Sequence, residues 1–254
     1  MSHLNEKVIV ITGGAGGIGE STARMAHAQG ASVVITDLNK DAVESIAQSL
    51  GERALAVAVD VTSRDDNERM IKAAVEAFGR VDAVFLNAGI EGEVGPFESR
   101  SDAAWDKVFA VNVQGVRLGV AAALPALRKA GGGSIVITSS VAGVRGAAGL
   151  TPYVSSKHAV LGMMRCLAAE LGPEGIRVNT VNPGPVDNRM MRSIEEQANP
   201  GHGEEVHQAF AARIPLGRYV TNEEVAGMAT FLFSDAASGC NGNAYLVDGG
   251  YCAQ

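Results

Sequence analysis

Short apolar runs rich in β-branched residues alternate along the chain with longer segments of helical periodicity. Runs such as KVIVIT at 7–12 hold consecutive apolar residues, which is typical of strands buried on both faces of a parallel sheet. The runs that we interpret as strands, some with the turn after them, are 7–12, 32–37, 54–61, 81–89, 133–140, 176–184 and 244–250. The pattern predicts an α/β fold with a doubly wound parallel sheet of about seven strands and helices on both faces.

The segments between these runs predict the helices and the domain organisation. We expect helices from the first glycine-rich turn to about residue 30, and then at 39–51, 63–79, about 103–130, about 152–172 and about 222–234. No linker rich in Pro, Gly or Ser divides the chain, so residues 1–254 are expected to form a single domain. The stretch at about 185–221 is expected to be a long irregular substrate loop or lid, with a mobile part at 197–205.

Composition narrows the range of partners. The chain has 254 residues, of which 46% are hydrophobic and 19% charged, as in ordinary globular proteins. Its net charge of −7 and the lack of a Lys or Arg block argue against nucleic acid and membrane surfaces as partners. Three cysteines without ligand or disulfide spacing, and a beginning without signal-peptide character, lead us to expect a cytoplasmic protein.

The stretch TGGAGGIG at 12–19 stands between the first strand and the first helix. It fits two dinucleotide-binding fingerprints at once, G-x-G-x-x-G and T-G-x-x-x-G-x-G. In both, glycines form a tight turn that lets phosphates approach the backbone N–H groups of the helix N-terminus. A glycine-rich turn with no ligand is the less favoured alternative.

Polar and small residues come after the next three strands, where such a sheet binds its ligand. An acidic Asp37 after the second strand could accept hydrogen bonds from a ribose and would repel a 2′-phosphate, which favours NAD over NADP. Asp60 after the third strand could meet the adenine. Asp37 could instead be a helix N-cap or a turn residue, and Asp60 could instead cap the next helix. Asn87, Ala88 and Gly89 after the fourth strand are small enough for a cofactor to lie against.

The fifth strand ends at Ser140, and Tyr153 and Lys157 come on the next predicted helix. Their i,i+4 spacing places Tyr153 and Lys157 on one helical face. A neighbouring ammonium lowers the pKa of a phenol, which could then exchange a proton with a substrate hydroxyl or carbonyl. This pair alone could equally be a surface contact on a helix, and the glycine loop and Ser140 make the catalytic interpretation stronger.

Together these motifs resemble the short-chain dehydrogenase/reductase family over essentially the whole chain. The resemblance implies a Rossmann-like domain, a homotetramer and a tetrad of Asn112, Ser140, Tyr153 and Lys157. Tyr153 would be the general acid/base, Lys157 would lower its pKa and hold the nicotinamide ribose, and Asn112 would help to hold a proton-relaying water. The resemblance also favours the T-G-x-x-x-G-x-G fingerprint, in which Gly14 and Gly16 only fill the loop. The expected cofactor-binding residues are Thr12, Gly13, Gly17, Ile18, Gly19, Asp37, Leu38, Asp60, Val61, Asn87, Ala88, Gly89, Tyr153, Lys157, Pro183, Gly184, Val186 and Asn188. Asn188 stands where the family often has a Thr that bonds the carboxamide.

The substrate is expected to lie over the nicotinamide, against Ser140, Val141, Tyr153, Met190 and Met191. Largely apolar walls at 90–95, 141–149 and after Gly184 predict a small-molecule alcohol or ketone. No metal-ligand spacing is present, and Ser140 lacks the G-x-S-x-G elbow of a serine hydrolase.

The sequence therefore predicts reversible hydride transfer between NAD(H) and a secondary alcohol or ketone, with a leaning toward cyclic substrates. A 3-oxoacyl-[acyl-carrier-protein] reductase is an alternative that Asp37 and the negative net charge disfavour. A non-catalytic NAD-binding regulator is disfavoured by the complete tetrad. Substrate identity, stereochemistry, physiological direction and oligomeric state are left open.

Overall fold

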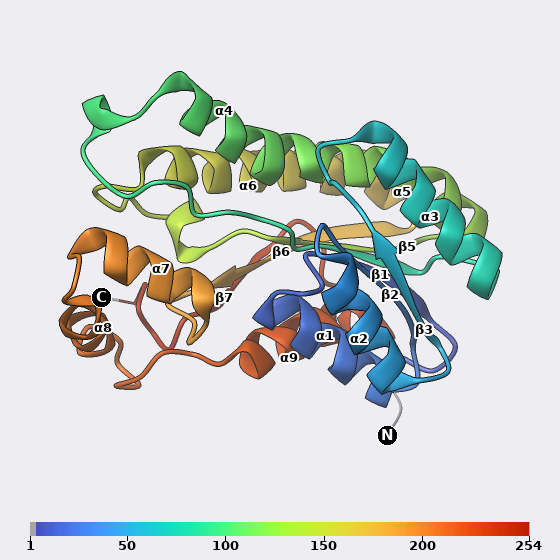
Figure 1. Ribbon diagram of the computed structural model, residues 1–254. Helices are drawn as coiled ribbons and strands as arrows, with labels where there is room; N and C mark the ends of the chain where they lie inside the picture. Colours follow the sequence, from blue (N-terminus) through green and yellow to red (C-terminus); the bar gives the residue numbers. More distant parts are fainter. Residues whose placement is uncertain (1–3, 254) are drawn as a thin grey trace.

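The structure is a computed structural model that describes residues 4–253. Seven parallel strands form one sheet in the order β3-β2-β1-β4-β5-β6-β7 (Figure 1). The strands are β1 (Val8–Thr12), β2 (Ser32–Asp37), β3 (Ala54–Ala58), β4 (Ala83–Leu86), β5 (Gly133–Thr138), β6 (Ile176–Pro183) and β7 (Ala244–Val247). The strand order reverses between β1 and β4, so the sheet is doubly wound as predicted, and its ligand crevice lies at the carboxyl ends of these strands.

Helices cover both faces of the sheet, as Figure 1 shows. The helices are α1 (Gly17–Ala28), α2 (Lys40–Leu50), α3 (Arg64–Phe78), α4 (Asp102–Phe109), α5 (Gly115–Ala130), α6 (Thr151–Leu171), α7 (Arg189–Ala198), α8 (Gly203–Ala211) and α9 (Asn222–Phe233). Five short turns complete the fold: η1 (Phe97–Ser99), η2 (Ala110–Gln114), η3 (Val141–Gly143), η4 (Gly172–Glu174) and η5 (Asp235–Ala237). Helices α3, α5 and α6 pack on one face, and α1, α2 and α9 on the other.

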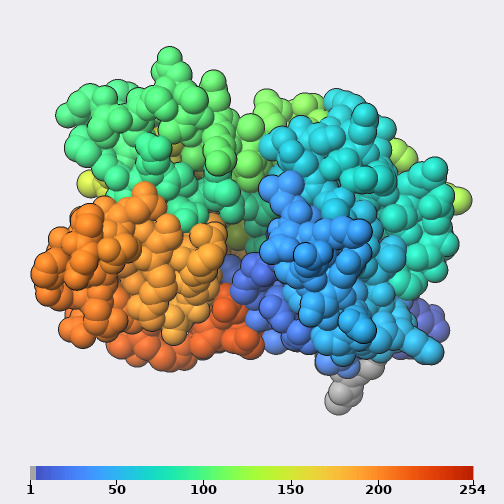
Figure 2. All heavy atoms as spheres, in the orientation of Figure 1, coloured from blue at the N-terminus to red at the C-terminus, as the bar shows by residue number. Residues whose placement is uncertain are grey.

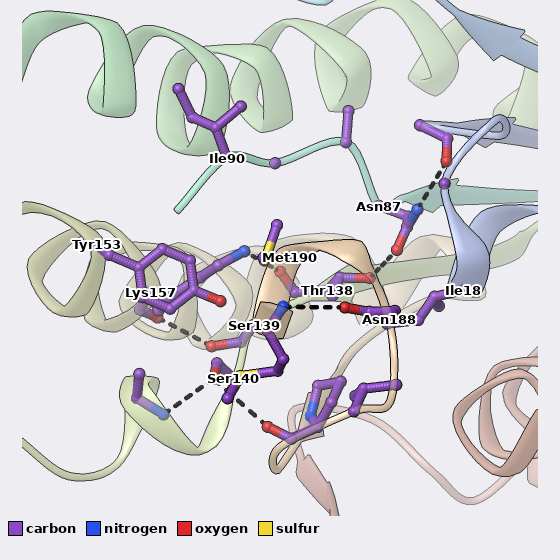
Figure 3. Close-up of a pocket in the computed structure, with 18 of the residues that line it drawn as sticks. Ile18, Asn87, Ile90, Thr138, Ser139, Ser140, Tyr153, Lys157, Asn188 and Met190 are labelled. Atoms are coloured by element: carbon purple, nitrogen blue, oxygen red, sulfur yellow. Dashed lines mark hydrogen bonds between the residues drawn. The ribbon is translucent and has the colours of Figure 1, made fainter. Parts of the chain in front are cut away.

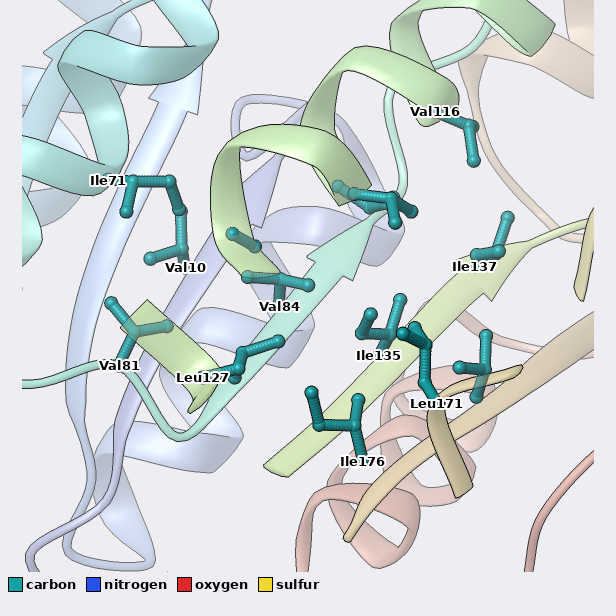
Figure 4. Packing of buried hydrophobic residues seen from close by; sticks show 14 of the residues in the cluster. Val10, Ile71, Val81, Val84, Val116, Leu127, Ile135, Ile137, Leu171 and Ile176 are labelled. Carbon is teal, nitrogen blue, oxygen red and sulfur yellow. The ribbon is translucent and has the colours of Figure 1, made fainter. Parts of the chain in front are cut away.

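Successive strand residues point to opposite faces and so enter two separate cores. In β1, Val8 and Val10 belong to the core beneath α3, α5 and α6, whereas Ile9 and Ile11 belong to the core beneath α1, α2 and α9. Figure 4 shows the first core, where Val10, Val84 and Ile135 from three neighbouring strands lie among helical side chains. Burial on both faces explains why the strands lack an alternating polar pattern.

The expected helix boundaries agree with local capping chemistry. Asn39 and Ser63 accept hydrogen bonds from the first turns of α2 and α3, and Thr221 forms a capping box with Glu224 at α9. The long helical region expected at about 103–130 is instead interrupted by the π-helical turn η2. Its span Asp102–Ala130 is long and apolar enough to cross a membrane by length and composition, but it packs against α3, α6 and the sheet as a core helix does.

The expectation of an irregular stretch at about 185–221 was wrong, because this segment contains α7 and α8. Helix α7 buries only Ile194 and Glu195, and its other positions are more exposed and mostly polar, so little apolar sequence marks it as a packed element. Its N-terminus is capped by Asn188, whose side chain accepts a hydrogen bond from the Met191 N–H. The two helices lie beside the carboxyl ends of β6 and β7 in Figure 1, at the edge of the predicted ligand crevice.

Candidate active site

A cavity of about 770 Å³ opens at the carboxyl ends of the strands. In Figure 2, α7 and α8 (orange) face the segment around η1 and α4 (green) across one side of the molecule. Most of the expected cofactor residues line this cavity: Gly13, Gly17, Ile18, Asp37, Leu38, Asp60, Val61, Asn87, Ala88, Gly89, Tyr153, Lys157, Pro183, Gly184, Val186 and Asn188. The expected residues Thr12, Gly19 and Asn112 lie behind the lining, so they shape the cavity rather than face it.

Close backbone packing explains the glycine loop. Gly13 has a φ of +64°, a conformation that favours glycine, and a Cβ on Gly19 would lie 2.2 Å from the carbonyl oxygen of Gly13. The interpretation of Gly14 as loop filler was wrong. A Cβ on Gly14 would lie 2.4 Å from Ile35, and its N–H donates to Thr36 O at 2.8 Å. Gly16 does have room, since its Cβ would meet nothing closer than 3.4 Å.

Thr12 and Asn87 tie the glycine loop to the end of β4. The Thr12 hydroxyl oxygen accepts hydrogen bonds from the N–H groups of Asn87 (3.0 Å) and Ala88 (3.1 Å). The Asn87 side chain donates to the carbonyl oxygens of Thr12 and Gly13, each at 3.2 Å. The Thr138 hydroxyl then donates to Asn87 Oδ1 at 3.0 Å, which extends the network to β5. The turn is therefore held by three strands.

Both aspartates at strand ends have structural partners as well as a place in the cavity wall. The Asp37 carboxylate accepts hydrogen bonds from the N–H groups of Ala15 (3.2 Å) and Asn39 (3.1 Å), so it lies beside the glycine loop. Asp60 Oδ1 accepts from the N–H (2.8 Å) and hydroxyl (2.7 Å) of Thr62. Asp60 therefore stabilises a turn and also lines the cavity, whereas the alternative interpretation of Asp60 as the cap of the next helix was wrong, because Ser63 caps α3.

Ser140, Tyr153 and Lys157 converge in the cavity, as Figure 3 shows. Tyr153 and Lys157 come from one face of α6, and the Lys157 Nζ lies 5.4 Å from the centre of the Tyr153 ring. Lys157 Nζ also donates to Thr138 O at 2.9 Å. The Ser140 hydroxyl is held by the Ala142 N–H (3.1 Å) and by Pro183 O (3.4 Å). Three polar groups, one from the start of η3 and two from α6, therefore come together at the cavity wall.

Burial dominates the proton affinities of this group. It raises the pKa of Tyr153 to about 12, with the Ser140 hydroxyl acting in the opposite direction and the Glu91 carboxylate adding to the rise. Burial likewise lowers the pKa of Lys157 to about 8. The lowering of the Tyr153 pKa by Lys157 stays a prediction, since burial is the largest influence on that pKa in the chain by itself.

Asn112 lies in the π-helical turn η2 and holds the residues around the tetrad together. Its side-chain amide exchanges two hydrogen bonds of 2.9 Å with the backbone of Ile90. It also donates to the Ser156 hydroxyl at 3.0 Å. A Cβ on Gly89 would lie 3.3 Å from Asn112 Oδ1 and 3.4 Å from Lys157 Nζ. Asn112 therefore lies near Lys157. The hydrogen bonds of the Asn112 side chain go to Ile90 and Ser156 in the surrounding structure.

Close packing and capping also position the residues after β6. A Cβ on Gly184 would lie 2.8 Å from the Asp248 backbone, so the chain can reach Val186 only through a glycine. Asn188 uses its Oδ1 to cap α7 (3.2 Å) and its Nδ2 to donate to Asn222 Oδ1 at 3.4 Å. Both polar atoms of the Asn188 side chain therefore already have partners within the chain. A hydrogen bond from Asn188 to the nicotinamide carboxamide, as expected from the sequence, would compete with the capping of α7.

The expected substrate residues Ser140, Val141, Tyr153, Met190 and Met191 all line the cavity. Sequence reasoning missed Thr138, which ends β5, and Ser139, which follows it and donates to Lys157 O at 3.1 Å. It also missed Phe210 and Tyr251, because nothing in their spacing indicates that they reach this wall. No cluster of three or more His, Cys, Asp or Glu residues that could hold a metal ion occurs among residues 4–253.

The cavity fits a nicotinamide dinucleotide. Its floor combines the glycine turn, of which Gly13, Gly16 and Gly17 line the cavity, with the N–H groups at the start of α1, where no side chain caps the helix. The Asp37 carboxylate lies at one side of this turn, and Tyr153 and Lys157 line the same cavity. A nicotinamide dinucleotide is elongated and carries phosphates and two riboses. Its phosphates can accept from the N–H groups of α1, and its riboses can bond to polar side chains such as Asp37 and Lys157.

A family model described as enoyl-(acyl carrier protein) reductase matches residues 13–252. Levodione reductase of Leifsonia aquatica is 35% identical over 257 residues, covering 99% of this chain and 96% of the relative. Cyclohexanol dehydrogenase of Acinetobacter sp. (strain SE19) is 37% identical over 256 residues, covering 100% and 98%.

Solved structures agree with this relationship. The crystal structure of levodione reductase superposes with a TM-score of 0.95 at 35% identity and covers 98% of both chains. A 3-ketoacyl-(acyl-carrier-protein) reductase from Brucella melitensis, complexed with NADH, gives a TM-score of 0.89 at 32% identity, covering 98% and 99%. With its doubly wound sheet, glycine loop and converging Ser140, Tyr153 and Lys157, the chain belongs to the short-chain dehydrogenase/reductase family of oxidoreductases.

Proposed function

We propose that this oxidoreductase is NAD-dependent and interconverts a cyclic secondary alcohol and its ketone. The observation that carries the proposal is the convergence of Ser140, Tyr153 and Lys157 in the cavity that the glycine loop also lines. Bound nicotinamide would supply or accept the hydride. The polypeptide must then bind the carbonyl oxygen and move one proton to or from it, which these three side chains are suited to do.

In this proposal Tyr153 exchanges the proton with the reacting oxygen. With a pKa raised to about 12, its phenol is protonated at neutral pH, which is the form that donates to a carbonyl oxygen during reduction. The Ser140 hydroxyl is fixed by its contacts to Ala142 and Pro183, so it can hydrogen-bond the same oxygen. Lys157, with a pKa of about 8, is mainly charged at neutral pH and stabilises negative charge that develops nearby.

The same lining supports NAD over NADP. Asp37 places a carboxylate at the end of β2, where it would accept hydrogen bonds from ribose hydroxyls and repel a 2′-phosphate. The neighbouring cavity residues Leu38 and Asn39 carry no positive charge to attract such a phosphate. The cofactor would be held by Gly13, Gly17, Asp37, Asn87 and Lys157, with Pro183, Gly184 and Val186 beside the nicotinamide.

The largely apolar substrate wall and the relatives support a cyclic substrate. Val141, Met190 and Met191 line the cavity near Ser140, and flexible methionines adapt well to an alicyclic ring. Two of the relatives are levodione reductase and cyclohexanol dehydrogenase. A 3-oxoacyl thioester is the rival substrate, because the Brucella reductase has the same fold.

A homotetramer is also part of the proposal. The edge strand β7 leaves Leu246 45% exposed, and Phe231 on the neighbouring helix α9 is 40% exposed. Apolar side chains at a sheet edge suit contact with another subunit. Light scattering of the purified protein would measure the mass directly, and a monomer of 26.2 kDa would contradict this part of the proposal.

The test is a substrate panel assayed at 340 nm with the purified protein. Cyclohexanol, an open-chain secondary alcohol and a 3-hydroxyacyl thioester are oxidised with NAD and, separately, with NADP. The proposal expects the highest kcat/KM for cyclohexanol with NAD. A higher kcat/KM for the thioester would contradict the cyclic substrate and favour a 3-hydroxyacyl thioester. A higher kcat/KM with NADP would overturn the role of Asp37.

A further inference from the structure

Arg145 brings a positive charge to the substrate side of the cavity, and the hydride and proton transfers do not use it. It follows Val144, the C-cap residue of η3, and it lines the same cavity as Tyr153. The backbone N–H of Arg145 donates to Val141 O at 3.1 Å. Arg145 therefore lies about one helical turn, ~5.4 Å, beyond Val141, which is the residue after Ser140. One short, well-held segment therefore presents both the Ser140 hydroxyl and the Arg145 guanidinium to one cavity.

The guanidinium is held in place by the C-terminal segment. Its carbon lies 4.5 Å from the centre of the Tyr251 ring, and Nη1 donates to Tyr251 O at 3.2 Å. It also faces the Cys252 thiol, whose pKa it acts to lower against the larger effects of burial and Asp248. A stacked guanidinium loses little further freedom when it binds a ligand.

Arg145 has unused binding capacity. A guanidinium has five N–H donors, of which one goes to Tyr251 O and another to the Cys252 thiol, so donors are left for a ligand. Within residues 4–253 no carboxylate forms an ion pair with it, whereas Arg189 in the same wall lies 3.7 Å from Glu91. The neighbouring wall is mostly apolar, with Val141, Ile194 and Phe210. The half-buried guanidinium of Arg145, surrounded by apolar side chains and with N–H donors still available, is suited to bind an oxygen acceptor of a ligand.

We propose that Arg145 binds a second oxygen group of the substrate, a carbonyl or carboxylate carried on the ring away from the reacting centre. The inference rests on the proposed function and narrows its substrate class to cyclic alcohols and ketones with two oxygen functions. Ser140 and Tyr153 hold the reacting oxygen at one end, and Arg145 holds the other oxygen. Two fixed polar contacts separated by apolar wall orient the ring for hydride transfer.

The test compares cyclohexanone, cyclohexane-1,4-dione and 4-oxocyclohexanecarboxylate as substrates for reduction. Arg145→Met is expected to lower kcat/KM for the dione and the carboxylate by about tenfold to a hundredfold, the effect of losing a charge-assisted hydrogen bond. The kcat/KM for cyclohexanone stays within about twofold, because it has no second oxygen to lose. Arg145→Lys should restore part of the loss for the carboxylate.

A control variant separates local from general effects. Arg64→Met removes the same charge from the exposed face of α3 and should alter no substrate ratio. A loss confined to the carboxylate identifies the second group as an anion, and a loss for both identifies a general acceptor site. Equal losses for all three ketones, or no loss, would overturn the proposal, since a role in folding cannot discriminate between substrates.

A binding measurement distinguishes this inference from the proposed function. If the wild-type protein reduces none of these ketones, the proposed function fails. Isothermal titration of 4-oxocyclohexanecarboxylate into Tyr153→Phe protein with NADH present then tests the site without turnover. Weaker binding when Arg145→Met is added supports the second oxygen site, and unchanged binding refutes it.

Discussion

The Lys157 ammonium nitrogen lies 5.4 Å from the centre of the Tyr153 ring, and its own hydrogen bond goes to Thr138 O at 2.9 Å. Lys157 thus joins helix α6 to β5. Thr138 bonds Asn87, which bonds the carbonyl of Gly13. This chain of contacts links Lys157 to the glycine loop, so the two halves of the site are positioned by one hydrogen-bond network.

The buried Lys157 predicts a specific pH dependence of stability. Its pKa is lowered to about 8 in the folded chain, against about 10.4 when unfolded. Between pH 8 and 10 the unfolded chain therefore binds more protons, and stability rises with pH by up to about 1.4 kcal/mol per unit. Above pH 10 the raised pKa of Tyr153 acts in the opposite direction. Lys157→Met should remove the rise between pH 8 and 10.

Denaturant unfolding at several pH values, without added nicotinamide, measures this effect. Lys72→Met on the exposed face of α3 is the matched control and should reproduce the wild-type curve. An identical slope for wild-type and Lys157→Met protein between pH 8 and 10 would show that Lys157 is not desolvated.

Asp37→Asn should shift cofactor preference. The change removes the negative charge beside the glycine loop and leaves the side chain almost the same size. We expect the ratio of kcat/KM for NADP to that for NAD to rise about tenfold or more, because one charge-assisted contact to ribose and one repulsion are lost. Steady-state kinetics with both cofactors measure the ratio. Asp41→Asn, in the first turn of α2, should leave it unchanged; equal ratios for both variants would reject the role of Asp37.

Substitution of loop glycines should separate tight from open positions. Gly14→Ala would bring a Cβ to 2.4 Å from Ile35 and is expected to lower the free energy of unfolding by about 1–3 kcal/mol. Gly16→Ala meets nothing closer than 3.4 Å and should cost under about 1 kcal/mol. Thermal unfolding without nicotinamide compares the two. Equal losses would mean that the loop relaxes and that its packing does not select glycine at position 14.

A buried carboxylate anchors α7. Glu195 Oε1 accepts a hydrogen bond of 2.7 Å from the Tyr219 hydroxyl and lies 3.1 Å from His207 Nδ1, while Arg192 donates to Oε2 at 3.2 Å. Glu195→Gln places an amide donor against these donors and should lower stability by about 1–3 kcal/mol. Glu204→Gln, on the exposed face of α8, is the control, and chemical denaturation that finds the two variants equal would refute the anchor.

The sequence was most informative where periodicity and strand ends coincide. Consecutive apolar residues such as those of β1 predicted a sheet buried on both sides, and the structure confirms this. The positions at or beyond the strand ends predicted one site for Asp37, Ser140 and Tyr153, and all three line the cavity. Their catalytic and binding roles stay predictions.

Other features depend on contacts that sequence spacing does not encode. Helix α7 was missed because its buried face contains Glu195, a charged residue that its partners Arg192, His207 and Tyr219 make tolerable inside the fold. Arg145 contacts Tyr251, which lies 106 positions away in the sequence. The raised pKa of Tyr153 depends on the depth of its burial, which no local motif reports.

The central claim is that Tyr153 carries the proton between the polypeptide and the substrate oxygen. The most direct measurement is the rate of hydride transfer by Tyr153→Phe protein, monitored at 340 nm in a single turnover with the best substrate of the panel. We predict a loss of about 10²–10⁴-fold, with NADH affinity within about threefold of wild type. Tyr245→Phe, on strand β7, should retain the wild-type rate. A Tyr153→Phe protein that keeps more than about a tenth of the rate would contradict the account.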